Sequence, residues 1–282
     1  MKNLRLFIRG TYYHIEISGV GSPAVLLHGF AGSTVDWLSI QNRLKASHQV
    51  IAVDLLGHGK TDVPTETKRY QMAEAVDDLK EIFLQMALPP VILVGYSMGG
   101  RLALAFAATY PIYVRHLLLE SSSPGLKTEK ERIERCNQDT VLAEQILQNG
   151  TEWFASYWRE RPIFQMKDVL DPLLNSHLQA LYQRQKKSNA CGLANSLRGM
   201  GTGMQNSYWS YLEKISVPTT LICGANDKKF CTINKEMQHL MPDAKLFCIP
   251  NAGHRVHLER LDAFWQIMQQ HITVIDKEGK VR

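Results

Sequence analysis

The chain has 282 residues, which is enough for one large domain or for a core domain with a modest insertion. Hydrophobic residues make up 45% and charged residues 21%, as in ordinary globular proteins, which excludes a disordered or fibrous chain. The net charge of +5 fits a basic surface for nucleic acid or a basic pocket for a small anion, but no basic run with interleaved aromatics occurs, so we expect no nucleic-acid partner.

Short apolar runs alternate with segments of helical periodicity up to about residue 120. Before this pattern begins, residues 4–8 and 13–17 read as two short strands that are joined at Gly10 and predict a hairpin. Further strands are expected at 24–27, 49–53, 91–94 and 114–119, with helices near 34–45, 72–86 and 99–109. Continuous apolar runs suit strands that are buried on both faces, as in a parallel sheet.

The alternation stops after residue 123, and residues 127 to about 211 read as several helices without a convincing strand. Strands return at 219–223 and 244–249, and a helix is expected near 257–270. We therefore predict a core formed by residues 1–123 and 212–282, interrupted by a helical cap at 124–211.

The sequence also bears on the location of the protein and on its metal content. The most apolar stretch, 91–108, contains a serine, an arginine and three glycines, and the start of the chain lacks an apolar run of signal-peptide length, so we expect a soluble, cytoplasmic protein that does not contact a membrane. The five cysteines form no C-x-x-C pair, which favours buried free thiols over a disulfide framework or a zinc site. No H-E-x-x-H sequence occurs, and we expect neither a metal nor a cofactor.

The pentapeptide Gly95-Tyr96-Ser97-Met98-Gly99 directly follows the apolar run 91–94 and precedes a helix-forming run. This strand–turn–helix setting is what a nucleophile elbow requires, because the sharp turn strains the serine and needs small neighbours. The alternative is a glycine-rich turn without chemistry. We interpret Ser97 as the catalytic residue.

A serine hydroxyl needs a base to become reactive. In folds that carry a nucleophile elbow, the catalytic residues follow the chain order serine, acid, histidine. His254 follows the predicted strand 244–249, whereas His257 falls where the last helix begins and is expected at the surface or as a cap. Asp227 follows the strand 219–223 and is favoured as the acid over Glu120, which follows another strand.

The loop His28-Gly29-Phe30-Ala31-Gly32 follows the strand 24–27. In this setting one oxyanion-binding N–H comes from that loop and one from the residue after the nucleophile, here Phe30 and Met98. His28 is expected to support the loop through hydrogen bonds rather than to react.

The triad, the H-G-F loop and the Asp54-Leu55-Leu56-Gly57-His58-Gly59 turn resemble the α/β-hydrolase superfamily over nearly the whole chain. That resemblance implies an α/β fold with a mostly parallel central sheet, an N-terminal hairpin and an inserted helical cap. Three stretches, at 95–101, 119–126 and 131–135, look more narrowly like the SHCHC synthases (2-succinyl-6-hydroxy-2,4-cyclohexadiene-1-carboxylate synthases) of menaquinone biosynthesis.

The narrower resemblance implies a small substrate with several carboxylates, which arginine pairs with through parallel hydrogen bonds. The family's substrate arginines fall on Arg101 and Arg135, and more loosely on Arg184, with Lys187 as a neighbouring candidate. Its pocket aromatics fall on Tyr96 and Trp158. For any single cap arginine the alternative is a solvated helix face. Arg101 differs because it lies one helical turn past Ser97.

The resemblance implies elimination of pyruvate, with Ser97 acting as a base rather than as an acyl-transfer nucleophile. The alternative is an ester or C–C hydrolase that uses the same triad. A third possibility is a noncatalytic binder on the same fold, which the intact Ser97, Asp227 and His254 disfavour. Several arginines that converge on the serine would favour the lyase over an esterase for apolar acyl groups.

Overall fold

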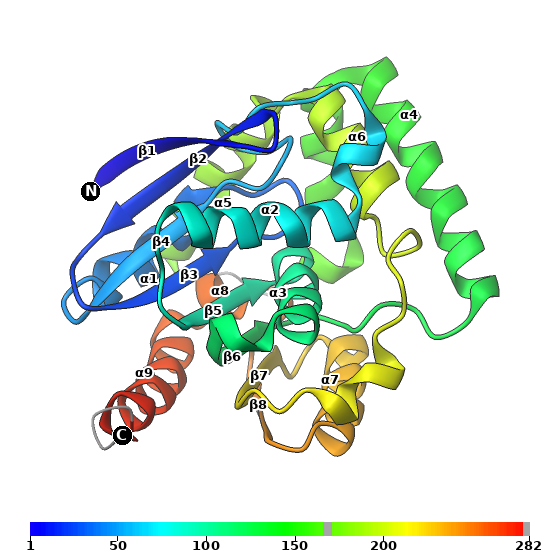
Figure 1. The fold of residues 1–282 in the computed structure, drawn as a ribbon. Helices are drawn as coiled ribbons and strands as arrows, with labels where there is room; N and C mark the ends of the chain where they lie inside the picture. Colours follow the sequence, from blue (N-terminus) through cyan, green and yellow to red (C-terminus); the bar gives the residue numbers. More distant parts are fainter. Residues whose placement is uncertain (166–170, 279–282) are drawn as a thin grey trace.

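An eight-stranded sheet runs through the centre of the computed structural model, which describes residues 1–165 and 171–278 (Figure 1). The strand order is β1-β2-β4-β3-β5-β6-β7-β8. The strands are β1 (Lys2–Ile8), β2 (Thr11–Ser18), β3 (Ser22–Leu27), β4 (His48–Val53), β5 (Val91–Tyr96), β6 (Val114–Glu120), β7 (Thr219–Gly224) and β8 (Ala244–Ile249).

The first two strands form the expected hairpin, in which β1 and β2 are antiparallel, and β2 is also antiparallel to β4. All the remaining strand pairs are parallel. The carboxyl ends of β3 to β8 therefore meet at one edge of the sheet, the edge at which ligands bind in open α/β folds. The mostly parallel sheet with an N-terminal hairpin confirms the predicted fold class.

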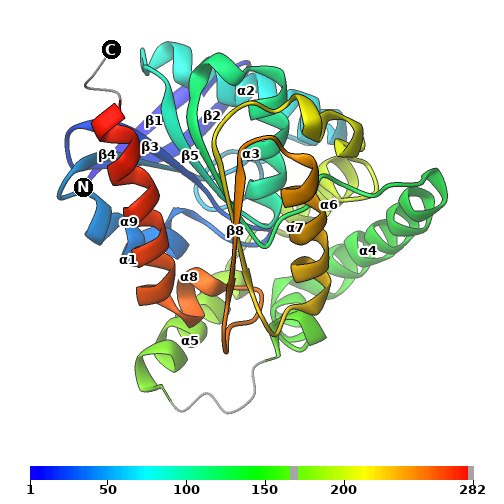
Figure 2. The same ribbon diagram turned by 90° about the horizontal axis from the view of Figure 1, so that it is seen from below.

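Helices cover both faces of the sheet. The described helices outside the segment between β6 and β7 are α1 (Leu38–Leu44), α2 (Met72–Gln85), α3 (Met98–Thr109), α7 (Lys228–Leu240), α8 (Val256–Glu259) and α9 (Leu261–Glu278). The side chains of β3 alternate, so that Val25 and Leu27 pack with α2 and α3, while Ala24 and Leu26 pack with α1 and α9. Figure 2 shows α1 and α9 on one side of the sheet and α2, α3 and α7 on the other.

The chain between β6 and β7 is helical in its described residues, with α4 (Glu129–Arg159), α5 (Pro172–Lys186) and α6 (Ala190–Met200). A reciprocal capping box between Thr128 and Glu131 starts α4. Gly150 interrupts α4 with a φ of 80°, a conformation that glycine adopts without strain. Short 3-10 segments join the elements: η1 (Thr34–Trp37), η2 (Thr67–Tyr70), η3 (Pro111–Tyr113), η4 (Pro162–Phe164) and η5 (Trp209–Lys214).

Two parts of the C-terminal region differ from the expected pattern. Helix α7 was not among the expected helices, because its sequence is largely polar and only Asn234 and Met237 are fully buried. The single helix expected near 257–270 is divided into α8 and α9 at Arg260, whose backbone is not helical. Within the described ranges, no helix is both long and apolar enough to cross a membrane.

Candidate active site

Ser97 lies in a sharp turn between β5 and α3, with a φ of 51° and a ψ of −107°. A side chain rarely adopts this conformation, and the surrounding glycines make room for it. A Cβ on Gly95 would lie 2.5 Å from the Gly99 carbonyl oxygen, and one on Gly99 would lie 2.3 Å from the Leu27 carbonyl oxygen. Gly95 and Gly99 therefore let the strand, the turn and the helix approach closely, which is the geometry expected of a nucleophile elbow.

A hydrogen-bonded chain connects Ser97 to two residues from neighbouring strand ends. Ser97 Oγ lies 3.1 Å from His254 Nε2, and His254 Nδ1 lies 2.6 Å from Asp227 Oδ2. Asp227 follows β7 and caps α7 by accepting from the Phe230 N–H. His254 and Asp227 are buried, so their hydrogen bond is shielded from competing water. The structure thus brings together the three residues that the sequence predicted as a triad.

The loop after β3 lies against the elbow. A Cβ on Gly29 would lie 2.6 Å from the Tyr96 ring, so glycine is needed for this approach. His28 Nε2 accepts from the Leu55 N–H, and its Nδ1 lies 2.7 Å from the Gly29 carbonyl oxygen, which matches the supporting role expected of His28. Met98 is the first residue of α3, so its N–H has no acceptor within the helix.

A cavity of about 450 Å³ opens above Ser97 between the sheet edge and the helices inserted between β6 and β7. An aromatic wall closes one side, where the Phe30 ring packs on Phe154 and Trp158, and Trp158 packs on Phe164. The predicted residues that line the cavity are Phe30, Ser97, Met98, Arg101, Arg135, Trp158 and His254.

Arg101 projects from α3 into this cavity and is only 8% exposed. Its guanidinium donates to Gln205 Oε1 at 2.6 Å and to the Met200 carbonyl oxygen at 2.7 Å, both neutral acceptors. Burial, with a further contribution from nearby Arg135, lowers the pKa of Arg101 to about 10. The side chain therefore remains charged at neutral pH while its positive charge is not neutralised by a directly bonded carboxylate.

Arg135 lies in the first half of α4 and donates to Asp139 Oδ1 at 2.8 Å, one turn further along. Burial raises the pKa of the Asp139 carboxyl, and the adjacent Arg135 and Arg101 oppose that shift. Two cations that were not predicted, Arg161 and Lys229, also line the cavity. Among the described lining residues, four cationic side chains thus face a single carboxylate, so the cavity favours an anion.

The sequence contained partial signals for these two cations. Arg161 belongs to the Trp158-Arg159-Glu160-Arg161 stretch that drew attention to Trp158, and Lys229 follows Asp227 by two residues. Nothing in the sequence separated Arg161 and Lys229 from the other cations expected at the surface.

Three predicted pocket residues lie elsewhere. Arg184 does not line the cavity, because its guanidinium pairs with Asp36 at 2.6 Å. Lys187 directly follows α5 and is also outside the lining. Tyr96 is buried beside the cavity, where its ring lies 5.4 Å from that of His254 and its hydroxyl pairs with Arg255. Burial raises the pKa of the Tyr96 phenol, so it stays protonated.

The two unselected triad candidates, Glu120 and His257, pair with each other. His257 Nδ1 lies 2.8 Å from Glu120 Oε2, and the His257 N–H donates to Glu120 Oε1 at 3.0 Å. The expectation of a surface or capping role for His257 was wrong, because the side chain is 2% exposed. The backbone explains the burial, since α8 folds back over the end of β6 and carries the ring inward.

The cysteines also differ from expectation. All five are free thiols, but only Cys223 is fully buried, while Cys191 and Cys248 are exposed. Cys136 and Cys231 are half-buried. The sequence did not indicate that three of the thiols lie close together in space.

Comparisons with known proteins agree with this geometry. Residues 23–261 match the alpha/beta hydrolase fold family, which defines the class of protein. A Bacillus subtilis protein provisionally named 2-succinyl-6-hydroxy-2,4-cyclohexadiene-1-carboxylate synthase is 46% identical over 94% of this chain and 96% of its own length. A Photorhabdus laumondii protein with that synthase name is 31% identical over 90% of this chain and 86% of its own length.

Among solved structures, MenH from S. aureus superposes with a TM-score of 0.87 at 30% identity, covering 94% of this chain and 98% of that one. The chain therefore belongs to the α/β-hydrolase superfamily and, within it, to the family of 2-succinyl-6-hydroxy-2,4-cyclohexadiene-1-carboxylate synthases.

Proposed function

We propose that this protein eliminates pyruvate from 2-succinyl-5-enolpyruvyl-6-hydroxy-3-cyclohexene-1-carboxylate, giving 2-succinyl-6-hydroxy-2,4-cyclohexadiene-1-carboxylate in menaquinone biosynthesis. The observation that carries the proposal is Arg101, which is buried, charged and aimed into the same cavity as Ser97. An esterase for apolar acyl groups would gain nothing from a desolvated cation there, whereas a substrate carboxylate would. The names of the relatives support the same reaction.

In the proposed mechanism Ser97 is the base. Asp227 fixes the tautomer of His254, and His254 Nε2 accepts the hydroxyl proton of Ser97 as Ser97 Oγ takes a proton from the carbon beside the succinyl ketone. The electron pair of the broken C–H bond, held first in the ketone enolate, forms the ring C2=C3 double bond, and the pair of the existing C3=C4 double bond shifts to C4=C5. The C5–O bond to the enolpyruvyl group breaks, and the released enolate takes up the proton held by His254 to become pyruvate, which returns Ser97 and His254 to their starting protonation states.

The ketone oxygen carries the negative charge at the transition state. We assign the Phe30 and Met98 amides as its hydrogen-bond donors, since both residues line the cavity beside Ser97. Loss of one such donor typically raises the barrier by about 3–4 kcal/mol. Arg101 and Arg135 would hold carboxylates of the substrate, and Trp158 would pack against its ring. Arg184 has no role in this assignment because it is paired with Asp36.

The direct test is to incubate the purified protein with the enolpyruvyl precursor and to follow pyruvate release. Ser97→Ala should abolish the release. Arg101→Ala should lower kcat/KM by roughly 10- to 100-fold, which corresponds to hydrogen bonds to a charged group. The matched control is Lys130→Ala, an exposed cation on α4, which should stay within about twofold of wild type.

Two results would contradict the proposal. One is the absence of pyruvate release together with ready hydrolysis of esters, which would point to an acyl-transfer enzyme. The other is full elimination activity in Arg101→Ala, which would remove the basis for assigning Arg101 to the substrate.

A further inference from the structure

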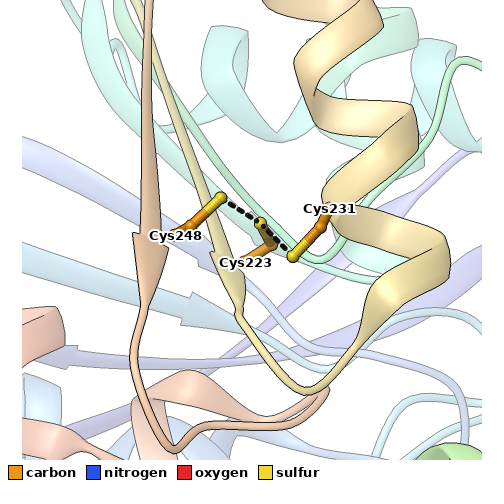
Figure 3. Close-up of side chains that lie close together, drawn as sticks. All are labelled: Cys223, Cys231 and Cys248. Carbon is orange, nitrogen blue, oxygen red and sulfur yellow. Dashed lines mark hydrogen bonds between the residues drawn. The ribbon is translucent and has the colours of Figure 1, made fainter.

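Three cysteines meet next to the loop that carries Asp227, and none of them is among the residues that line the cavity. Cys223 comes from β7, Cys248 from β8 and Cys231 from the first turns of α7 (Figure 3). Cys223 Sγ lies 3.3 Å from Cys231 Sγ and 3.4 Å from Cys248 Sγ, and all three sulfurs lie within 4.8 Å of one another. Figure 3 shows the three side chains pointing toward one another with Cys223 in the middle.

The positions of the three cysteines in the backbone bring their side chains together. Cys223 and Cys248 are register partners on parallel neighbouring strands, so their side chains leave the sheet on the same face. Helix α7 packs on that face, and Cys231 also contacts the Gly224 carbonyl oxygen at 3.1 Å. The sulfurs are therefore held by two strands and a helix rather than by a flexible loop.

The spacing suits coordination to one ion. Metal–thiolate bonds of about 2.3 Å place two sulfurs on the same ion roughly 3.7–4.0 Å apart. The observed separations lie close to that range, so small side-chain movements would suffice. They are far longer than a disulfide bond of about 2.05 Å. Three sulfur ligands without oxygen donors select soft cations.

We propose that Cys223, Cys231 and Cys248 form a binding site for a soft, thiophilic cation, Cu⁺ or Zn²⁺, held by three thiolates. Each thiol loses its proton as its sulfur bonds to the ion, and no change of oxidation state is involved. Cys248 is exposed and provides the route of entry, while Cys223 is fully buried and anchors the site.

The position gives such a site a link to the active site. Cys223 precedes Gly224, and the Cys231 N–H donates to the Asp227 carbonyl oxygen at 2.9 Å. The two cysteines thus flank the loop 224–227, which places the Asp227 carboxylate against His254. A bound cation would hold both ends of this loop and raise the Tm of the protein.

The test uses the full-length protein, reduced and kept free of oxygen. It is titrated with Cu⁺ and, separately, with Cd²⁺ as a spectroscopic substitute for Zn²⁺. We expect one equivalent of at least one ion to bind, with sulfur-to-metal charge-transfer absorption and a rise in Tm. The two titrations show which occupant the site prefers.

Variants identify the ligands. Cys248→Ser should weaken binding by at least about tenfold, and because Cys248 is exposed this change should leave the fold intact. The matched control is Cys191→Ser, an exposed cysteine outside the cluster, which should bind as wild type does. Failure of both ions to bind stoichiometrically would overturn the proposal, as would equal binding by Cys248→Ser. Pyruvate release is measured separately and does not enter this outcome.

Discussion

Two buried histidines that lie three residues apart in the chain each pair with a carboxylate, but the opposite sides of their rings contact different groups. His254 and His257 are both 2% exposed, and both direct Nδ1 to a carboxylate, at 2.6 Å in Asp227 and 2.8 Å in Glu120. His254 Nε2 lies 3.1 Å from Ser97 Oγ at the cavity. The His257 ring instead packs against Trp37, with ring centroids 4.6 Å apart.

The comparison shows that burial and a carboxylate partner do not by themselves make a histidine reactive. Both features fix the orientation of the ring, but only a second nitrogen that faces a reacting group can transfer a proton. The His257–Glu120 pair instead joins α8 to the end of β6, next to the Glu120 carbonyl that accepts from the Ser97 N–H at 2.9 Å. Matched acid-to-amide substitutions in the two pairs should separate these roles.

The largest effect is expected for Asp227→Asn. The amide can still cap α7, but it would stabilise the wrong tautomer of His254, so that Nε2 could no longer accept the Ser97 proton. We expect kcat for pyruvate release to fall by about 10³- to 10⁴-fold, with little change in Tm. A loss smaller than tenfold would argue against the Asp227–His254–Ser97 chain as the proton-transfer route.

Glu120→Gln should instead lower the stability of the protein and change kcat little. The amide replaces a charged acceptor that is 0% exposed and receives bonds from both the ring and the backbone of His257. We expect the free energy of unfolding to fall by about 2 kcal/mol, measured by denaturant titration, while kcat stays within about tenfold of wild type. A collapse of kcat with unchanged stability would place Glu120 in the reaction rather than in the fold.

Buried histidines without a carboxylate partner form a third case, and their contribution to the pH dependence of stability is the smallest of the expected effects. Burial lowers the pKa of His58 and of His116 to about 3, whereas an unfolded chain has a histidine pKa of about 6.5. Between these values the unfolded state binds more protons, so stability decreases as the pH falls below about 6.5. The slope approaches about 1.4 kcal/mol per pH unit for each histidine.

His116→Gln should remove one of these two contributions. Denaturant titrations from pH 6.5 to pH 5 should show a shallower loss of stability in the variant than in wild type. An identical slope in the two proteins would mean that His116 is protonated in the folded state.

Much of the fold and of the site could be predicted from local sequence. Most of the parallel strands are apolar runs, and residues that follow parallel strands must meet at one edge, which is why Ser97, Asp227 and His254 could be found. Arg101 could be found because a helix places the residue one turn past Ser97 on the same side.

What escaped prediction depends on contacts between distant segments. Arg184 resembled a substrate arginine, but its orientation is decided by Asp36, which lies 148 positions away in the chain. The burial of His257 depends on how α8 folds over β6. The three cysteines come together only through the β7–β8 register and the packing of α7, and neither leaves a motif in the sequence.

Arg101 is a core residue whose two acceptors, Gln205 and the Met200 carbonyl oxygen, belong to the segment between β6 and β7. Its guanidinium is therefore immobilised before any ligand arrives, and the entropy cost of ordering it, typically about 0.5–1.5 kcal/mol, is met during folding rather than on binding. A carboxylate would exchange part of its hydration for a cation already in place. Discrimination between anionic and neutral ligands thus becomes a property of how the inserted segment docks on the sheet, and mutations at that junction should alter selectivity without touching the ligand.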